Sequence, residues 1–250
     1  MKRISLITLI AIVVSLVFTS CIEVAIKETI HGDGKLVTKL IDITEFSKIE
    51  IETYVEVNYS QEQNTGNLEF TVDGNLWEYY DICTNKDVLQ IKLKKEHKNS
   101  LNLNPTKSLI KVSSELLDKI SIAGSSDIVF CTDFNSENLR IGLAGSSKII
   151  ANQHQINIEN CEVEIAGSAT VKFKGQIRKT DINIAGSGKI SALDCEMEQL
   201  SIDIAGSGNV EAHVTDILIV SIAGSGEVAY KGEPGTVKTN IAGSGKVIKL

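Results

Sequence analysis

Proline, aromatic residues and histidine are scarce in this chain of 250 residues. There are two prolines, one tryptophan and four histidines, and aromatic residues make up 5% of the sequence. This composition excludes a broad core built around large rings and favours narrow stacked strands rich in Ile and Val. Basic residues are also in deficit, because the net charge is −7. A nucleic-acid-binding face needs an excess of Lys and Arg, so no nucleic-acid partner is expected.

The cysteines lack the spacing of a metal site. No two of them form a CxxC pair, and the histidines are not clustered, so we expect no metal and no cofactor. Cys83, Cys131, Cys161 and Cys195 are an even set, which permits disulfides in an exported protein without selecting among three pairings. Cys161 stands where other repeats mostly have Leu or Val, which favours a buried free thiol at that position.

Residues 1–20 have the pattern of a signal peptide. Lys2 and Arg3 precede an uncharged apolar run, residues 4–18, that is short for a bilayer span. Small residues directly before Cys21 resemble a bacterial lipobox, after which Cys21 would be lipidated and become the mature N-terminus. An ordinary secretory signal followed by a chance cysteine is the alternative. We expect an exported protein that is lipid-anchored in the cell envelope, at the outer membrane.

Residues 21–35 are expected to form a tether, and residues 36–115 an N-terminal β region in which apolar and polar residues alternate. Ile51, Val72 and Leu93 follow one another at intervals of 21 residues, which indicates degenerate rungs of a solenoid. The alternative is a separate small β-sandwich. The aromatic group at residues 77–80 is interpreted as an end cap, with an exposed platform for a glycan or peptide as the alternative.

Residues 116–250 contain one short motif, Ile-Ala-Gly-Ser-Gly or a close variant, seven times. Its copies begin at Ile122, Leu143, Ile165, Ile184, Ile204, Ile222 and Ile241. The intervals between them are 21, 22, 19, 20, 18 and 19 residues, and a period near twenty is typical of a solenoid. Apolar residues flank each motif at alternating positions, so every repeat predicts two strands with inward-facing aliphatic side chains. We therefore predict an all-β, right-handed parallel β-helix with rungs of about 20 residues, which the N-terminal β region continues or caps.

Glycine and serine are constant at the second and third positions after the first residue of each motif. Such a glycine permits a tight turn between two sheets, and the serine hydroxyl is short enough to bond nearby backbone or to form a ladder with its neighbours. The predicted turn residues are Gly124, Ser125, Gly145, Ser146, Gly167, Ser168, Gly186, Ser187, Gly206, Ser207, Gly224, Ser225, Gly243 and Ser244.

Catalytic patterns fit this sequence poorly. Gly-Ser-Gly-Lys at residues 186–189 and 243–246 lacks the earlier glycine and the following Ser or Thr of a phosphate-binding loop. Glu164 and Asp203 occupy the same repeat position two rungs apart, with Asn183 between them. They would lie about 9–10 Å apart, near the upper end for an inverting glycosidase pair. The rest of that column reads as a solvated face, so we expect no enzyme and no catalytic residues. A carbohydrate-binding or pectin-lyase-like solenoid is the alternative.

The Gly-Ser-Gly repeats, the strand Phe46-x-x-Ile49-x-Ile51 and the lipoprotein-like N-terminus resemble one known family. It is the "putative auto-transporter adhesin, head GIN domain" family of Bacteroidetes-type bacteria, and the resemblance extends from about Ile41 to Leu250. It implies a β-helix whose Gly-Ser-Gly units form tight turns, and a role in adhesion without catalytic residues. The expected partners are a membrane through the N-terminal lipid, a host or envelope glycan or protein, and a second copy through the C-terminal rung.

Overall fold

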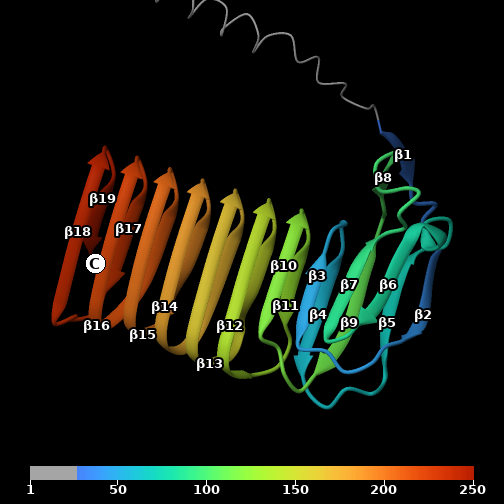
Figure 1. Cartoon of the computed structure of the whole chain (residues 1–250), viewed down its shortest axis with the longest axis horizontal. Coiled ribbons are helices and arrows are strands. Elements are labelled where there is room, and N and C mark those ends of the chain that lie inside the picture. The colour runs from blue at the N-terminus through green and yellow to red at the C-terminus, as the bar shows by residue number, and fades with distance from the viewer. Residues whose placement is uncertain (1–26) are drawn as a thin grey trace, which may run out of the picture.

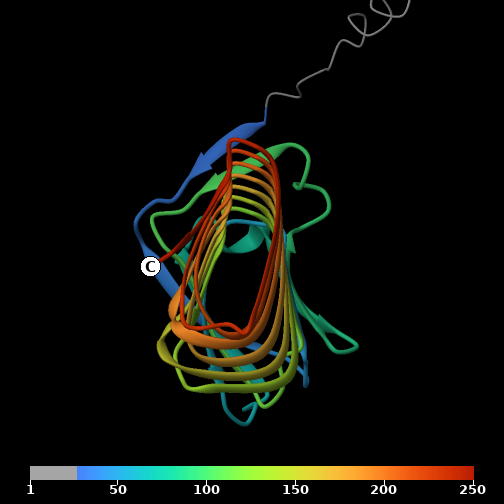
Figure 2. The same ribbon diagram turned by 90° about the vertical axis from the view of Figure 1, so that its left-hand side faces the viewer.

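The computed structural model describes residues 27–250 and consists almost wholly of strands (Figure 1). Its parallel strands stack into a solenoid with rungs of about 20 residues, which confirms the predicted fold class. Figure 2 looks along the rod from its C-terminal end and shows an oval cross-section, narrow at one corner and wide at the opposite one. The predicted signal peptide and Cys21 lie outside the described residues.

The seven Gly-Ser-Gly repeats build the rod in sequence order. Their strands are β10 (Lys119–Gly124), β11 (Asp127–Phe130), β12 (Phe134–Gly145), β13 (Lys148–Gly167), β14 (Thr170–Gly186), β15 (Lys189–Gly206), β16 (Asn209–Gly224), β17 (Glu227–Lys231), β18 (Thr236–Gly243) and β19 (Lys246–Lys249). The motifs stack in register, so that Ile165 lies beside Ile184 and Ile184 beside Ile204. Aliphatic side chains are thereby aligned in buried columns that run the length of the core.

The narrow corner of each rung is the Gly-Ser segment of the motif. Its glycine has φ between 124° and 137° in all seven copies. A Cβ on Gly186 would also lie 2.6 Å from the carbonyl oxygen of Gly167 in the preceding rung. Only glycine satisfies both conditions, because other residues are strained at such a φ and carry a Cβ. The backbone of adjacent rungs therefore approaches more closely here than any side chain would allow.

The serines act at this corner through their backbone. The N–H of Ser187 donates to the Gly167 carbonyl at 2.8 Å, and the same bond joins each later rung to the one before it. The serine side chains are exposed on the outside of the corner. The role expected for the hydroxyl, bonding to nearby backbone, is thus taken by the serine N–H.

The wide corner absorbs the differences in repeat length. Between Ala151 and Ile156, the offset between paired residues of β13 and β14 falls from 22 to 19 residues. Similar register shifts occur at the same corner in the pairing of β14 with β15 and of β15 with β16. Insertions therefore bulge outward at the wide corner, whereas the spacing through the motif is conserved from rung to rung.

The N-terminal β region contributes two further levels of parallel strands, but not in sequence order. The strands β3 (Lys48–Ile51) and β4 (Glu56–Gln61) pair with β10 and β11 on one side. On their other side they pair with β7 (Val88–Leu93) and β9 (Ser108–Ser114). Residues 48–61 thus lie between two segments that both follow them in the sequence.

The predicted equivalence of Ile51, Val72 and Leu93 is wrong. Ile51 pairs with Ile91, two residues before Leu93. Val72 belongs to an antiparallel strand opposite Val37. The 21-residue intervals arose because strands of either direction share the same alternation of apolar and polar residues, which does not encode direction.

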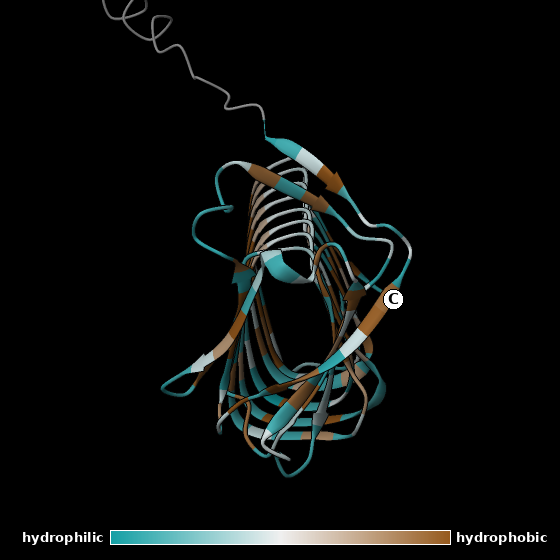
Figure 3. Ribbon diagram, turned by 90° about the vertical axis from the view of Figure 1, so that its right-hand side faces the viewer, coloured by the Kyte–Doolittle hydropathy of each residue, from teal (hydrophilic) through white to brown (hydrophobic). Residues whose placement is uncertain are grey.

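The N-terminal end of the rod is closed by antiparallel strands and aromatic residues. The strand β5 (Asn67–Asp73) pairs with β2 (Leu36–Asp42) and β9, and β6 (Tyr80–Asn85) pairs with β7. Between β5 and β6 lies the short helix η1 (Trp77–Tyr79). The Phe70 ring lies 5.5 Å from that of Trp77 and 4.9 Å from that of Tyr80. Figure 3 shows β2 crossing this end of the rod. The aromatic residues therefore cover the end of the core.

Of the predicted tether, residues 27–35 are described, and Glu28–His31 form strand β1. It pairs in parallel with β8 (Leu101–Asn104). The fully buried Asp73 carboxylate accepts hydrogen bonds from Gly34 N at 2.8 Å, Thr106 N at 2.8 Å and Thr106 Oγ1 at 2.6 Å. This one carboxylate therefore joins the loop after β1 to the loop after β8.

Replacement of Gly186 by Ala should destabilise the rod more than the same change at Gly124. Both glycines have a positive φ, but a Cβ on Gly124 would meet nothing within 4 Å, whereas one on Gly186 would meet Gly167. We expect a loss of about 1–2 kcal/mol for Gly124→Ala from strain alone, and a clearly larger loss for Gly186→Ala. Urea unfolding of both variants measures the difference. Equal losses would show that the contact between rungs is unimportant.

Asp73 should make stability depend on acid pH. Burial raises the pKa of Asp73, but hydrogen bonds from Thr106, Gly34 and Lys107 together outweigh it and hold the pKa below that of an ordinary aspartate. The stabilisation is therefore complete above the pKa of the unfolded chain and is lost as the pH falls through the lowered folded value. Asp73→Asn should cost about 2 kcal/mol at neutral pH and reduce this acid dependence. Urea unfolding across the acid range tests this, with the exposed Asp42→Asn as control. Parallel curves for wild type and Asp73→Asn would contradict it.

Candidate functional site: a groove along the outer face

A groove of about 920 Å³ runs along one outer face of the rod. It extends from Glu50 on β3 and Glu52 directly after that strand to Asn240 and Ala242 on β18. Two columns of outward side chains line it, one immediately before and one immediately after the inward-facing first residue of each motif. Because the rungs are in register, each rung presents the same two positions to anything that lies along the axis.

The column after the inward-facing residue is alanine in all seven repeats. These residues are Ala123, Ala144, Ala166, Ala185, Ala205, Ala223 and Ala242, and all are exposed. Their methyl groups form a shallow apolar floor beside the narrow corner. No alanine was among the residues predicted from the sequence to have a role. The constancy of this alanine at an outward position was the available signal, because only an inward position needs an apolar side chain for packing.

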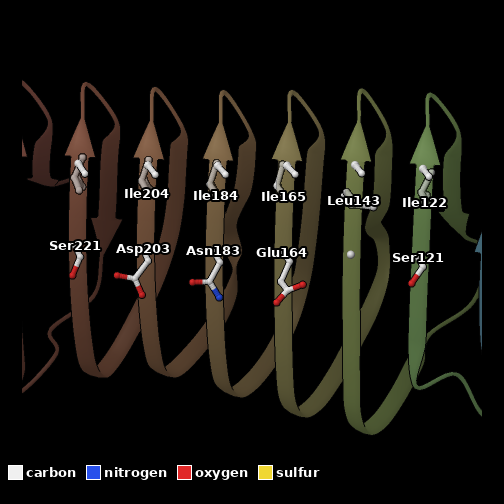
Figure 4. Close-up of a pocket in the computed structure, with 18 of the residues that line it drawn as sticks. Ser121, Ile122, Leu143, Glu164, Ile165, Asn183, Ile184, Asp203, Ile204 and Ser221 are labelled. Atoms are coloured by element: carbon white, nitrogen blue, oxygen red, sulfur yellow. The ribbon is translucent and has the colours of Figure 1, made fainter. Parts of the chain in front are cut away.

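The column before the inward-facing residue is polar in every repeat except the second, where it is Gly142. Figure 4 shows the side chains of Glu164, Asn183 and Asp203 on neighbouring strands, in one row with Ser121 and Ser221. The backbone pairing places Glu164 beside Asn183 and Asn183 beside Asp203. Within the described chain, the groove lining includes four carboxylates and no Lys, Arg or His. It therefore attracts cations and hydrogen-bond donors and repels anions.

Glu164 and Asp203 are exposed on an extended surface, two strand spacings apart. At about 4.8 Å per spacing, their backbones are separated by roughly 10 Å. The neighbouring column holds an ion pair between Arg140 and Glu162, whose Nε and Oε2 atoms are 3.1 Å apart. Both of these side chains are largely exposed, so the pair is worth at most about 1 kcal/mol.

The cysteines singled out in the sequence do not form a second functional site in the described part of the chain. Cys161 is a buried free thiol, as predicted, and Cys195 is buried as well. Burial raises the pKa of the Cys195 thiol to about 12, so it stays protonated near neutral pH. Among residues 27–250, no three His, Cys, Asp or Glu side chains are grouped so that they could hold a metal ion. The same part of the chain contains no helix with the length and hydrophobicity needed to cross a bilayer.

Fold and groove together define a parallel β-solenoid with a linear surface along its outer face. Residues 45–234 match the family described as "putative auto-transporter adhesin, head GIN domain", and the chain belongs to this family. The resemblance inferred from the repeats is thereby confirmed. No curated protein matches the sequence.

Three solved structures share the fold over their whole length. A protein from Parabacteroides distasonis, described as a "putative lipid binding protein", is 29% identical with a TM-score of 0.74, and the match covers 89% of this chain and 100% of that one. A "putative adhesin" from Bacteroides fragilis is 22% identical with a TM-score of 0.79, covering 88% and 100%. Another from P. distasonis is 25% identical with a TM-score of 0.61, covering 89% and 100%.

Proposed function

We propose that this protein is a non-enzymatic, lipid-anchored module of the cell envelope that binds an elongated ligand along its outer groove. The observation that carries the proposal is the groove itself, because it repeats one pair of side-chain columns through seven successive rungs. A long ligand can make the same weak contacts at each level and add them along its length. The adhesin description of the family agrees with this role.

The groove favours a neutral, hydroxyl-rich chain such as a glycan. Carboxylates of Glu164 and Asp203 and the amide of Asn183 accept hydrogen bonds from hydroxyl groups, and charged acceptors make the stronger bonds. The alanine floor accommodates an apolar ring face without steric hindrance. Acidic polymers are disfavoured because no basic side chain of the described residues lines the groove.

Substitutions in the alanine column should block this binding. Ala205→Arg places a long side chain across the groove at an exposed position, whereas Asn209→Arg makes a comparable change in the same rung, beyond the narrow corner. We expect Ala205→Arg to weaken binding to envelope and host glycans about tenfold or more. Both variants should keep their stability within about 0.5 kcal/mol, since neither position is buried.

Glycan arrays followed by titration calorimetry measure the effect. Equal binding by Ala205→Arg and Asn209→Arg would show that the ligand does not use the groove. Incubation with the same polysaccharides tests the enzymatic alternative. Reproducible product formation that is abolished by Glu164→Gln or Asp203→Asn would replace the binding role with a carbohydrate-active one.

Attachment to the membrane is proposed to occur through Cys21. The positive N-terminus, the apolar run and the small residues before this cysteine support it. Cys21→Ala should move the protein from the membrane fraction to the soluble fraction of the envelope, because no lipid can be attached. Fractionation followed by immunoblotting measures this, with Cys83→Ala as the matched cysteine control. Unchanged fractionation of Cys21→Ala would exclude lipid anchoring.

Self-association through the C-terminal rung stays a prediction. The strands β18 and β19 form the last described rung, and Val237, Ile241 and Ile248 are about 40% exposed there. A parallel strand from a second copy would cover these side chains.

A further inference from the structure

Basic side chains gather at one end of the rod, where β1, β2 and β8 meet. Residues 27–40 and 94–107 contain seven lysines and only three acidic residues, Glu28, Asp33 and Glu96, a net charge of +4. All other described residues hold 16 basic and 28 acidic side chains, a net charge of −12. The surface that these two segments form is therefore locally basic, although the overall composition of the protein is acidic.

Specific contacts bring the two segments together. The pairing of β1 with β8 places Lys27 next to the loop that precedes β8, where Lys27 Nζ donates to the Lys98 carbonyl at 3.0 Å. Through its bonds to Gly34 and Thr106, the Asp73 carboxylate holds the loops that carry Lys35 and Lys107 against each other. The lysines are thus clustered by the fold and not by their order in the chain.

Most of these lysines are not neutralised within the protein. Lys98 forms an ion pair with Glu52, and Lys39 Nζ lies 4.1 Å from the centre of the Trp77 ring. Of the ion pairs formed among residues 27–250, none includes Lys35, Lys94, Lys95 or Lys107. Their charges are available to an anionic partner.

Apolar side chains are exposed beside these charges. Leu36 and Leu40 on β2 are 47% and 69% exposed, and Lys35 and Lys39 directly precede them. Figure 3 shows β2 crossing the end of the rod. Leu36 and Leu40 alternate along this strand with the half-buried Val37 and Ile41, so they lie on its outer face. Exposed leucines at an end of the rod that also carries lysines suit a bilayer interface, where the apolar side chains enter the headgroup region and the ammonium groups remain at the phosphates.

The chain leaves the fold at this same end. β1 begins at Glu28, seven residues after Cys21, and an extended segment of that length spans at most about 25 Å. If Cys21 carries the lipid anchor, as proposed above, this short distance keeps the basic end of the rod close to the bilayer.

We propose that the end of the rod formed by β1, β2 and the loops before and after β8 is a docking surface for an anionic lipid bilayer. Its lysines contact lipid phosphates, and Leu36 and Leu40 enter the headgroup region. Docking through this end directs the rod, roughly 40 Å long for nine stacked strands, away from the membrane and presents the groove to ligands outside it.

Vesicle binding by a chain without lipid tests this surface independently of the anchor. The chain from residue 21 onward with Cys21→Ala should sediment with vesicles that contain phosphatidylglycerol and not with vesicles of phosphatidylcholine alone. Lys94→Gln with Lys95→Gln, or Lys35→Gln with Lys107→Gln, should each reduce partitioning, by about fivefold for every lysine removed at low salt. Lys238→Gln with Lys246→Gln makes the same charge change at the far end and should have little effect. Leu40→Ser should likewise reduce partitioning, whereas Ile248→Ser removes an exposed apolar side chain at the far end and should have little effect.

The single tryptophan gives a second readout, because Trp77 lies at the docking end beside Lys39. Brominated lipids should quench its fluorescence when vesicles are bound. Failure of the Cys21→Ala chain to bind anionic vesicles, equal loss with the far-end lysine pair, or binding without quenching would each overturn the docking surface. None of these results bears on fractionation in cells or on glycan binding, so a failure here is distinguishable from a failure of the proposed function.

Discussion

The close approach of backbone at the narrow corner is the contact on which the rest of the rod depends. There a glycine of one rung lies so near the carbonyl of the preceding rung that a Cβ on Gly186 would lie 2.6 Å from the Gly167 oxygen. The N–H of the next residue donates to that same carbonyl at 2.8 Å. Because each of the six later copies of the motif makes this contact with the copy before it, the rungs have one spacing and one register at this corner. Irregularities are confined to the wide corner, where bulges cost little.

This register creates the groove. An outward side chain on one rung lies beside the side chain at the equivalent position of the next rung. Residues at equivalent positions of the repeats therefore form a continuous row along the rod. Alanine next to the corner leaves a low floor, and the polar position two residues earlier supplies acceptors such as Asn183 and Asp203. The structural corner and the candidate binding surface are therefore built from the same short segment of each repeat, the motif together with the residue directly before it. Its constant residues form the corner and the floor, and its variable residues set the chemistry.

The two ends of the rod differ in construction. Toward the C-terminus, the rungs continue with the same parallel pairing through β18 and β19. At the N-terminal end, antiparallel strands, an aromatic cluster and the buried Asp73 interrupt the repeat. The interruption brings together lysines from two segments whose paired positions are about 70 residues apart in the sequence. The two ends of the rod are thereby distinguished, because a basic surface lies where the N-terminal chain leaves the fold.

The repeat alone determined the fold class, the family, the buried columns and the position of the glycine corner. These follow from local alternation and from a period near twenty, which only stacked rungs satisfy. Tertiary structure decided that β3 and β4 insert between β10–β11 and β7–β9, since alternation is the same for parallel and antiparallel strands and for any stacking order. It also decided that Ile51 pairs with Ile91 and that Lys35 lies near Lys107. Both depend on which distant segments pair and share a buried carboxylate, and no local pattern in the chain encodes that choice.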